Sequence, residues 1–196
     1  MADGTLKVGT ITTSSGSGTI TLGQSGETIT SSAALGSGMG KVLQVVSTAK
    51  SDTFTTTSTS FTDVTDLSVS ITPSSSSNKI FITTSFQFGA NSGSGYPQFR
   101  MLRDSTVINA GTASGSRSLG ILSMNIYNAD TASGSLCASS FLDSPATTSA
   151  TIYKIQSRNS GGNTTYVGSN SNDADAATSL RSASTITVME IAGWLI

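Results

Sequence analysis

The chain has 196 residues, a length that suits one domain or one domain with a short extension. Hydrophobic residues make up 36% and charged residues 11%, with ten basic side chains against eleven acidic ones. This balance excludes the basic surface of a nucleic-acid-binding protein, and no apolar run approaches the ~20 residues of a membrane-spanning helix. Abundant Ser and Thr, with recurring blocks of Ile and Val, favour a folded β protein over a disordered chain, whose usual mark is high net charge.

Residues 1–40 differ from the rest of the chain. The motif GTIT or GETIT recurs there around Ile11, Ile20 and Ile29, nine residues apart and separated by Gly- and Ser-rich turns. One such unit cannot bury a core, so we expect either a small meander or an arm that lies on a neighbouring subunit. A flexible low-complexity tail is the alternative. Residues 33–40 have the composition of a linker to the main domain, residues 41–196.

The clearest strand in the sequence is Asn78–Phe88, NKIFITTSFQF. Its even positions form one nearly continuous apolar row, and its odd positions are polar except for Phe81. A period of two predicts a strand with one buried face. The row consists of Ile80, Ile82, Thr84, Phe86 and Phe88.

Turn signals separate this strand from several others. Pro73–Asn78 predicts a turn, so residues 61–88 form either a hairpin or a strand-turn-strand unit. We predict the other strands at 41–47, 98–103, 106–109, 119–127, 135–142, 150–156 and 185–196, with 52–60 as an edge strand or a loop. No segment has a helical period. The pattern therefore predicts an all-β sandwich, with a jelly roll preferred to an immunoglobulin-like fold, whose Cys–Trp–Cys pattern is absent.

The last predicted strand, TITVMEIAGWLI, is apolar on both faces. We expect the second sheet to cover one face and an identical subunit to cover the other. The oligomer contact is predicted at Ile186, Val188, Met189 and Ile191. Glu190 is the only charge in this strand, and a buried carboxylate needs a partner, so we expect an ion pair with Arg100 or Arg103.

The sequence predicts no catalytic residue, no metal site and no cofactor. It contains no histidine, which excludes Ser–His–Asp and Cys–His catalysis and every His-ligated metal. The single cysteine, Cys137, lies in an alternating block and is expected to be a small buried side chain, in a protein made in a cytoplasm.

Two pairs of carboxylates offer the only enzymatic alternative. Asp63 and Asp66 could act on a glycosidic bond, but their position at the start of a strand favours a turn or cap. Asp173 and Asp175, in NDAD, could provide oxygens for Ca²⁺, although the twelve-residue EF-hand pattern is absent.

Tyr96 and Tyr166 lie in or beside loops rich in Gly, Ser and Asn, at residues 89–97 and 159–175. Recognition loops commonly have this composition, so both tyrosines are candidates for contacting a glycan or a protein on a host surface. Ordinary exposed aromatic residues would explain the pattern equally well.

Five segments together resemble small virion proteins and fibre-tip domains of tailed bacteriophages, especially those of marine and cyanobacterial hosts. The segments are KVLQVVSTAK, TSFTDVTDLSVSITPSSSSNKIFITTSFQFG, MLRDSTVI, SFLDSPATTSATIYKIQ and STITVMEIAGW. The resemblance covers about residues 41–196, and residues 1–31 resemble N-terminal segments of the same kind of protein.

This resemblance implies a non-enzymatic virion component, often a homotrimer, that contacts other virion proteins. In a tail fibre or appendage, residues 1–40 would attach, and the loops at 89–97, 110–118 and 159–175 would meet the host. In a capsid-decorating protein, the arm would lie over capsid subunits. We favour the appendage, and a free-standing lectin is the third interpretation.

Overall fold

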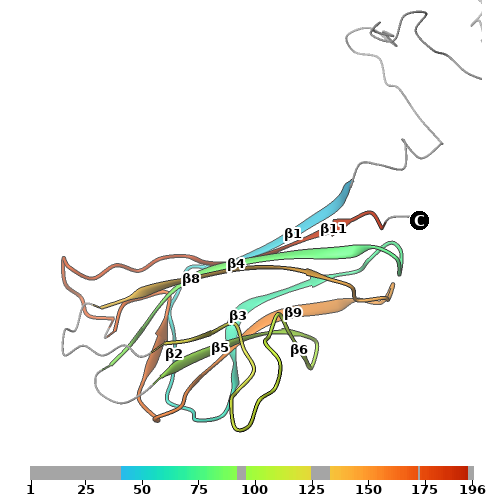
Figure 1. The fold of residues 1–196 in the computed structure, drawn as a ribbon. Helices are drawn as coiled ribbons and strands as arrows, with labels where there is room; N and C mark the ends of the chain where they lie inside the picture. Colours follow the sequence, from blue (N-terminus) through green and yellow to red (C-terminus); the bar gives the residue numbers. More distant parts are fainter. Residues whose placement is uncertain (1–40, 92–95, 125–132, 172, 194–196) are drawn as a thin grey trace, which may run out of the picture. The chain divides into compact units, whose positions relative to one another are not determined.

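The computed structural model describes residues 41–91, 96–124, 133–171 and 173–193 (Figure 1). The repeat arm and linker expected at residues 1–40 lie outside the described residues. Residues 125–127 and 194–196, the ends of two predicted strands, also lie outside them.

Within the described ranges the chain forms strands and no helix, which confirms the all-β prediction. The strands are β1 (Val42–Lys50), β2 (Phe54–Thr56), β3 (Thr62–Ile71), β4 (Lys79–Ala90), β5 (Pro97–Arg103), β6 (Thr106–Ile108), β7 (Leu122–Ser123), β8 (Ser135–Asp143), β9 (Thr151–Asn159), β10 (Thr165–Val167) and β11 (Ser184–Ile191).

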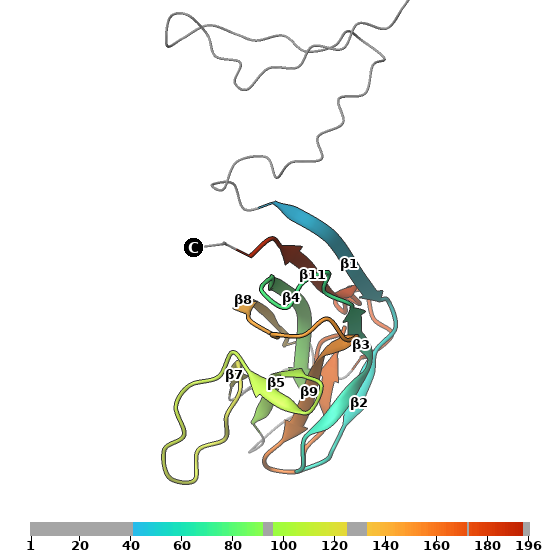
Figure 2. The same cartoon turned by 90° about the vertical axis from the view of Figure 1, so that its right-hand side faces the viewer.

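The strands form two antiparallel sheets that face each other across one core (Figure 1). Sheet A has the order β1-β11-β4-β10-β2, with β8 on the other side of β4. Sheet B has the order β3-β9-β5-β6, with β7 also paired to β5. Figure 2 shows β1, β11, β4 and β8 in one layer and β9 and β5 in the layer below. The fold is therefore a β-sandwich.

Most strands that follow one another in the chain lie in opposite sheets. The chain passes from β3 in sheet B to β4 in sheet A and back to β5, and later from β8 in sheet A to β9 in sheet B and back to sheet A. Such crossings occur in β-sandwiches of several topologies, so the jelly roll stays a prediction.

The core confirms the predicted period of two. All five residues of the predicted row on β4 are buried, and Ile80, Ile82, Phe86 and Phe88 are fully so. Phe86 and Phe88 of sheet A pack against Phe99 of sheet B, with ring centroids 4.9 and 5.0 Å from that of Phe99. These tilted and edge-to-face contacts join the two sheets at the centre of the sandwich.

Residues 61–88 form a strand-turn-strand unit and not a hairpin. β3 pairs with β9, whereas β4 pairs with β11 and β8, so the turn at 73–78 carries the chain from one sheet to the other. The strand predicted from residue 119 is wrong up to residue 121, since only Leu122–Ser123 form β7. Gly120 passes so close to β5 that a Cβ there would lie 2.4 Å from the carbonyl oxygen of Phe99, which explains the glycine.

Candidate functional site

The predicted oligomer residues of β11 divide between the two faces of sheet A. Ile186 and Val188 are fully buried and fill the core between the sheets, so their assignment to a subunit contact is wrong. Met189 and Ile191 alternate with them and lie half-buried on the outer face. Their role in self-association stays a prediction.

Glu190 is fully buried, but the expected ion pair with Arg100 or Arg103 is wrong. Its Oε1 accepts hydrogen bonds from Asn78 Nδ2 at 2.5 Å and from the Ser74 amide at 2.7 Å, and its Oε2 accepts from Gln44 Nε2 at 2.6 Å. Burial alone would raise the pKa of Glu190, but these hydrogen bonds have the larger combined effect and lower the pKa to about 2. Neutral donors from a turn and from β1 replace the expected arginine.

Arg103 instead binds a carboxylate at the edge of the sandwich. Its Nη1 donates to both oxygens of Asp143 at 2.9 Å, and the Tyr153 hydroxyl donates to the same carboxylate at 2.7 Å. Burial and this hydrogen bond raise the pKa of Tyr153. The cluster ties β5, β8 and β9 together, and its groups satisfy one another.

The outer face of sheet A carries one continuous row of apolar side chains. Strand pairing places Val45 opposite Met189, Met189 opposite Phe81, and Phe81 opposite Leu142, across β1, β11, β4 and β8. Val45 and Leu142, at the two ends, are 56% and 53% exposed. We call these four residues the apolar row.

The next row of the same face is made of hydroxyls. Ser47, Thr187, Thr83 and Ser140 occupy successive strands, and Ser47 and Thr187 share a hydrogen bond of 2.8 Å. An apolar row bordered by uncharged hydroxyls can pack against another protein surface without removing a charge from water.

The outer face of sheet B is chemically different, because it carries two arginines on one aromatic ring. The guanidinium carbons of Arg100 and Arg158 lie 4.1 and 4.8 Å from the ring centroid of Phe61. Phe61 directly precedes β3, whereas Arg100 belongs to β5 and Arg158 to β9. Three segments of the chain thus meet at this point in two cation–π contacts.

A repeated motif builds this arrangement. Gln98-Phe99-Arg100 on β5 and Gln156-Ser157-Arg158 on β9 run antiparallel, so that each arginine lies opposite the glutamine of the other strand. Arg158 Nε donates to Gln98 Oε1 at 2.7 Å, and Arg100 Nε donates to Gln156 Oε1 at 2.8 Å. We call Phe61, Gln98, Arg100, Gln156 and Arg158 the arginine face. This face was not predicted from the sequence, although the sequence contains the two Gln-x-Arg motifs that form it.

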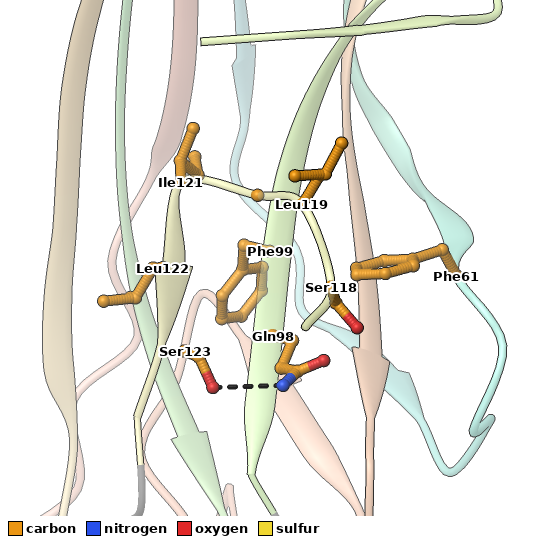
Figure 3. A pocket seen from close by; sticks show the side chains of 9 residues that line it. Phe61, Gln98, Phe99, Ser118, Leu119, Ile121, Leu122 and Ser123 are labelled. Atoms are coloured by element: carbon orange, nitrogen blue, oxygen red, sulfur yellow. Dashed lines mark hydrogen bonds between the residues drawn. The ribbon is translucent and has the colours of Figure 1, made fainter. Parts of the chain in front are cut away.

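A depression of about 170 Å³ adjoins the arginine face (Figure 3). Phe61 and Ser118 lie on one side of it, Gln98 and Phe99 lie in its middle, and Gln98 Nε2 donates to the Ser123 hydroxyl oxygen at 3.1 Å. From Ser118 the chain passes through Leu119 to the other side of the depression, where Ile121, Leu122 and Ser123 lie. The predicted loop at 110–118 therefore ends at this depression.

The structure places Tyr96 and Tyr166 at separate positions. Tyr96 directly precedes β5 of sheet B and is 43% exposed, whereas Tyr166 lies half-buried in β10 of sheet A. Their loops nevertheless meet, because the Ser160 amide donates to the Tyr96 carbonyl at 3.2 Å and the Asn91 amide donates to the Thr164 carbonyl at 3.1 Å. Recognition by either tyrosine stays a prediction.

One member of each acidic pair has neighbours that satisfy its charge. Asp63 accepts from Lys154 Nζ at 2.9 Å and from Gln156 Nε2 at 2.6 Å, and Asp173 accepts from Arg181 at 2.8 Å. The described residues contain no group of three or more His, Cys, Asp or Glu side chains placed to hold a metal ion. Across the same ranges, no helix has the length and apolar character needed to cross a membrane.

Comparison with known proteins gives no relative from which a role can be transferred. No family model matches the sequence, and no curated protein matches it significantly. The two outer faces of the sandwich are therefore the basis for proposing a function.

Proposed function

We propose that this chain is a non-enzymatic structural protein of a tailed-phage virion that assembles with copies of itself, as a homotrimeric part of a tail fibre or appendage. The observation that carries the proposal is the apolar row on the outer face of sheet A. The phage setting comes from the sequence resemblance, and the self-association comes from this surface.

The second copy of the chain is the partner that suits this face best. The apolar row contains no charge that would select an oppositely charged partner. Monomeric sheets usually protect their edges with charged side chains, but edge strand β1 exposes Val42, Leu43 and Val45, and β8 exposes Leu136 and Leu142. An exposed apolar strip that reaches both edges of one sheet is typical of a protein–protein interface.

The loops fit a host-facing role at one end of the same domain. Hydrogen bonds join the loop after β4, the start of β5 and the loop after β9, as the contacts of Tyr96 and Asn91 show. A rigid sandwich that presents joined loops at one end is a common scaffold for recognition. A capsid-decorating protein would use the same self-association face, and the two placements differ in where the protein lies on the virion.

The mass of the purified chain in solution, measured by light scattering, tests the proposal. We expect a trimer for the unmodified chain and a monomer with unchanged far-UV circular dichroism for the double variant Val45→Asp, Leu142→Asp. The matched control is Leu180→Asp, which introduces the same charge at a leucine that is 66% exposed outside the apolar row. A monomeric unmodified chain, or a double variant that keeps the mass of the unmodified chain, would contradict the proposal.

Electron microscopy of virions with gold-labelled antibodies to the chain tests the placement. Label on tails supports the appendage, and label on heads supports capsid decoration. Virions that carry no label would contradict both.

A further inference from the structure

We infer that the arginine face binds an acidic saccharide, with Arg100 contacting a carboxylate or sulfate group and the adjoining depression holding the sugar ring. The inference deepens the proposed function, on which it rests for the source of the ligand: it names the class of host-surface molecule that the sandwich would recognise. It also places the recognition site on sheet B, away from Tyr166 of sheet A.

Positive charge is in excess around Phe61 on the outer face of sheet B. Arg100, Lys154 and Arg158 carry three positive charges there, and Asp63 is the acidic side chain among them. Both oxygens of Asp63 accept hydrogen bonds from Lys154 and Gln156. Across the described ranges, neither arginine takes part in a salt bridge. Asp63 acts on Arg100 through its charge at longer range, so neither guanidinium group has a carboxylate bound directly to it among the described residues.

Arg100 keeps hydrogen-bond donors available for a ligand. Arg158 uses Nε, Nη1 and Nη2 to bind Gln98, the Thr59 carbonyl and Ser118. Arg100 donates from Nε alone, to Gln156, and its two Nη groups have no hydrogen-bond partner among the described residues. A guanidinium with two free parallel donors matches the oxygens of a carboxylate or a sulfate.

The two arginine side chains are held in place before any ligand binds. The Phe61 ring and Gln156 hold Arg100, and three hydrogen bonds hold Arg158, so little side-chain freedom is left to lose on binding. Burial and then the charge of Arg158 lower the pKa of Arg100, while the charge of Asp63 raises it, and an anion placed here would offset the repulsion between the two guanidinium groups. The arrangement thus stabilises a bound negative charge without rearrangement.

The depression favours a saccharide over an acidic peptide. Its volume of about 170 Å³ is below the roughly 300–1,000 Å³ of ordinary small-ligand pockets, so it suits a unit of ring size. Gln98, Ser118 and Ser123 offer amide and hydroxyl groups to sugar hydroxyls, while Leu119 and Ile121 offer apolar surface to the ring carbons. A deep apolar pocket for an anchoring side chain, as peptide interfaces use, is not part of it.

Binding of the full chain to immobilised polysaccharides tests the inference. The probes are polygalacturonate for the carboxylate, dextran sulfate for the sulfate, neutral dextran as control, and poly-glutamate for an acidic peptide. We expect binding to at least one acidic polysaccharide, weakening as NaCl rises from about 50 to about 300 mM because salt screens exposed charges. No binding to either acidic polysaccharide, equal binding to neutral dextran, or tighter binding to poly-glutamate would overturn the inference.

Two variants and one matched control assign the binding to Arg100. We expect Arg100→Gln to weaken binding at least about tenfold, since a hydrogen bond to a charged group is lost, and Arg100→Lys to recover part of it. Arg181→Gln removes the same charge from an exposed arginine that pairs with Asp173, outside the arginine face and the depression, and should leave binding unchanged. Binding by Arg100→Gln equal to that of the unmodified chain would overturn the assignment. If Arg100→Gln loses binding but keeps the trimeric mass, the saccharide site and the self-association are shown to be separate. If the chain is a trimer but binds no saccharide, this inference is wrong and the proposed self-association is unaffected.

Discussion

Replacing Glu190 with Gln should destabilise the protein strongly at neutral pH and hardly at all in acid. The carboxylate is fully buried among donors from Gln44, Ser74 and Asn78, and no cationic side chain of the described residues pairs with it. Its donors cannot easily turn to suit an amide. Gln44 Nε2 also donates to the Thr72 carbonyl at 2.8 Å, and the Asn78 side-chain carbonyl accepts from the Gly193 amide at 2.8 Å.

The expected loss of stability follows from the pKa of Glu190, which falls from an ordinary 4.5 to about 2 in the folded chain. A pKa difference of this size corresponds to about 3 kcal/mol in the free energy of unfolding. Because the folded pKa is the lower one, the ionised form stabilises the fold. This contribution is fully present above the unfolded-state pKa and is lost as pH falls from about 5 toward 2. The protonated acid resembles the amide, so the difference between the two proteins should then vanish.

Urea unfolding followed by far-UV circular dichroism, at one protein concentration and at several pH values from 7 to 2, measures the difference. We expect Glu190→Gln to lower the free energy of unfolding by about 3 kcal/mol at pH 7 and by less than about 1 kcal/mol near pH 2. Asp175→Asn, at an exposed carboxylate, is the matched control and should change little at any pH. A loss of stability that is the same at pH 7 and pH 2 would refute the assignment to the buried charge.

Two further predictions concern the core. Phe86→Ala should lower the free energy of unfolding by about 3–5 kcal/mol, because a fully buried ring at the junction of the sheets leaves a cavity. Leu136→Ala, at a leucine that is 68% exposed, is its control, and a loss below about 1 kcal/mol for Phe86→Ala in urea unfolding would contradict this packing. Burial raises the pKa of Cys137 to about 11, so the thiol should resist alkylation at pH 8 in the folded protein and react once urea unfolds it. Rapid labelling of the folded chain, followed by mass spectrometry, would argue against that burial.

Period-two alternation allowed much of the fold to be predicted. It identified the buried face of β4 and the burial of Cys137 on β8. These features depend on residues close together in the chain. Each strand shows them in its own sequence, because a half-buried strand must alternate.

The partners of Glu190 could not be predicted in the same way. Gln44, Ser74 and Asn78 reach the carboxylate from β1 and from the turn before β4, and their positions depend on the pairing of β1 and β4 with β11. An arginine seemed necessary because charge usually needs opposite charge. Four short hydrogen bonds from neutral donors stabilise the carboxylate instead, which a strand pattern does not encode.

The arginine face was missed for a related reason. Its charges look like the ordinary polar positions of β5 and β9 when each strand is considered alone. Only the antiparallel register sets Gln98 opposite Arg158 and Arg100 opposite Gln156, and only the path of the chain into β3 places Phe61 against both arginines. Repetition of Gln-x-Arg, once within the predicted strand 98–103 and once across the end of the predicted strand 150–156, is the kind of signal that would identify such a face in advance.

The two outer faces have consequences for each other if both proposals hold. Sheet A and sheet B are opposite layers of one sandwich, so a contact between copies through the apolar row turns sheet B of every copy away from the contact (Figure 1). The arginine face is then exposed on each subunit of the assembly. A polysaccharide repeats its acidic group along its length, and binding at one subunit raises the effective concentration at the next. Weak binding at a single depression of ring size can thus become firm attachment to a host surface. Such an assembly requires an uncharged contact on sheet A and a charged face on sheet B, which the apolar row and the arginine face provide.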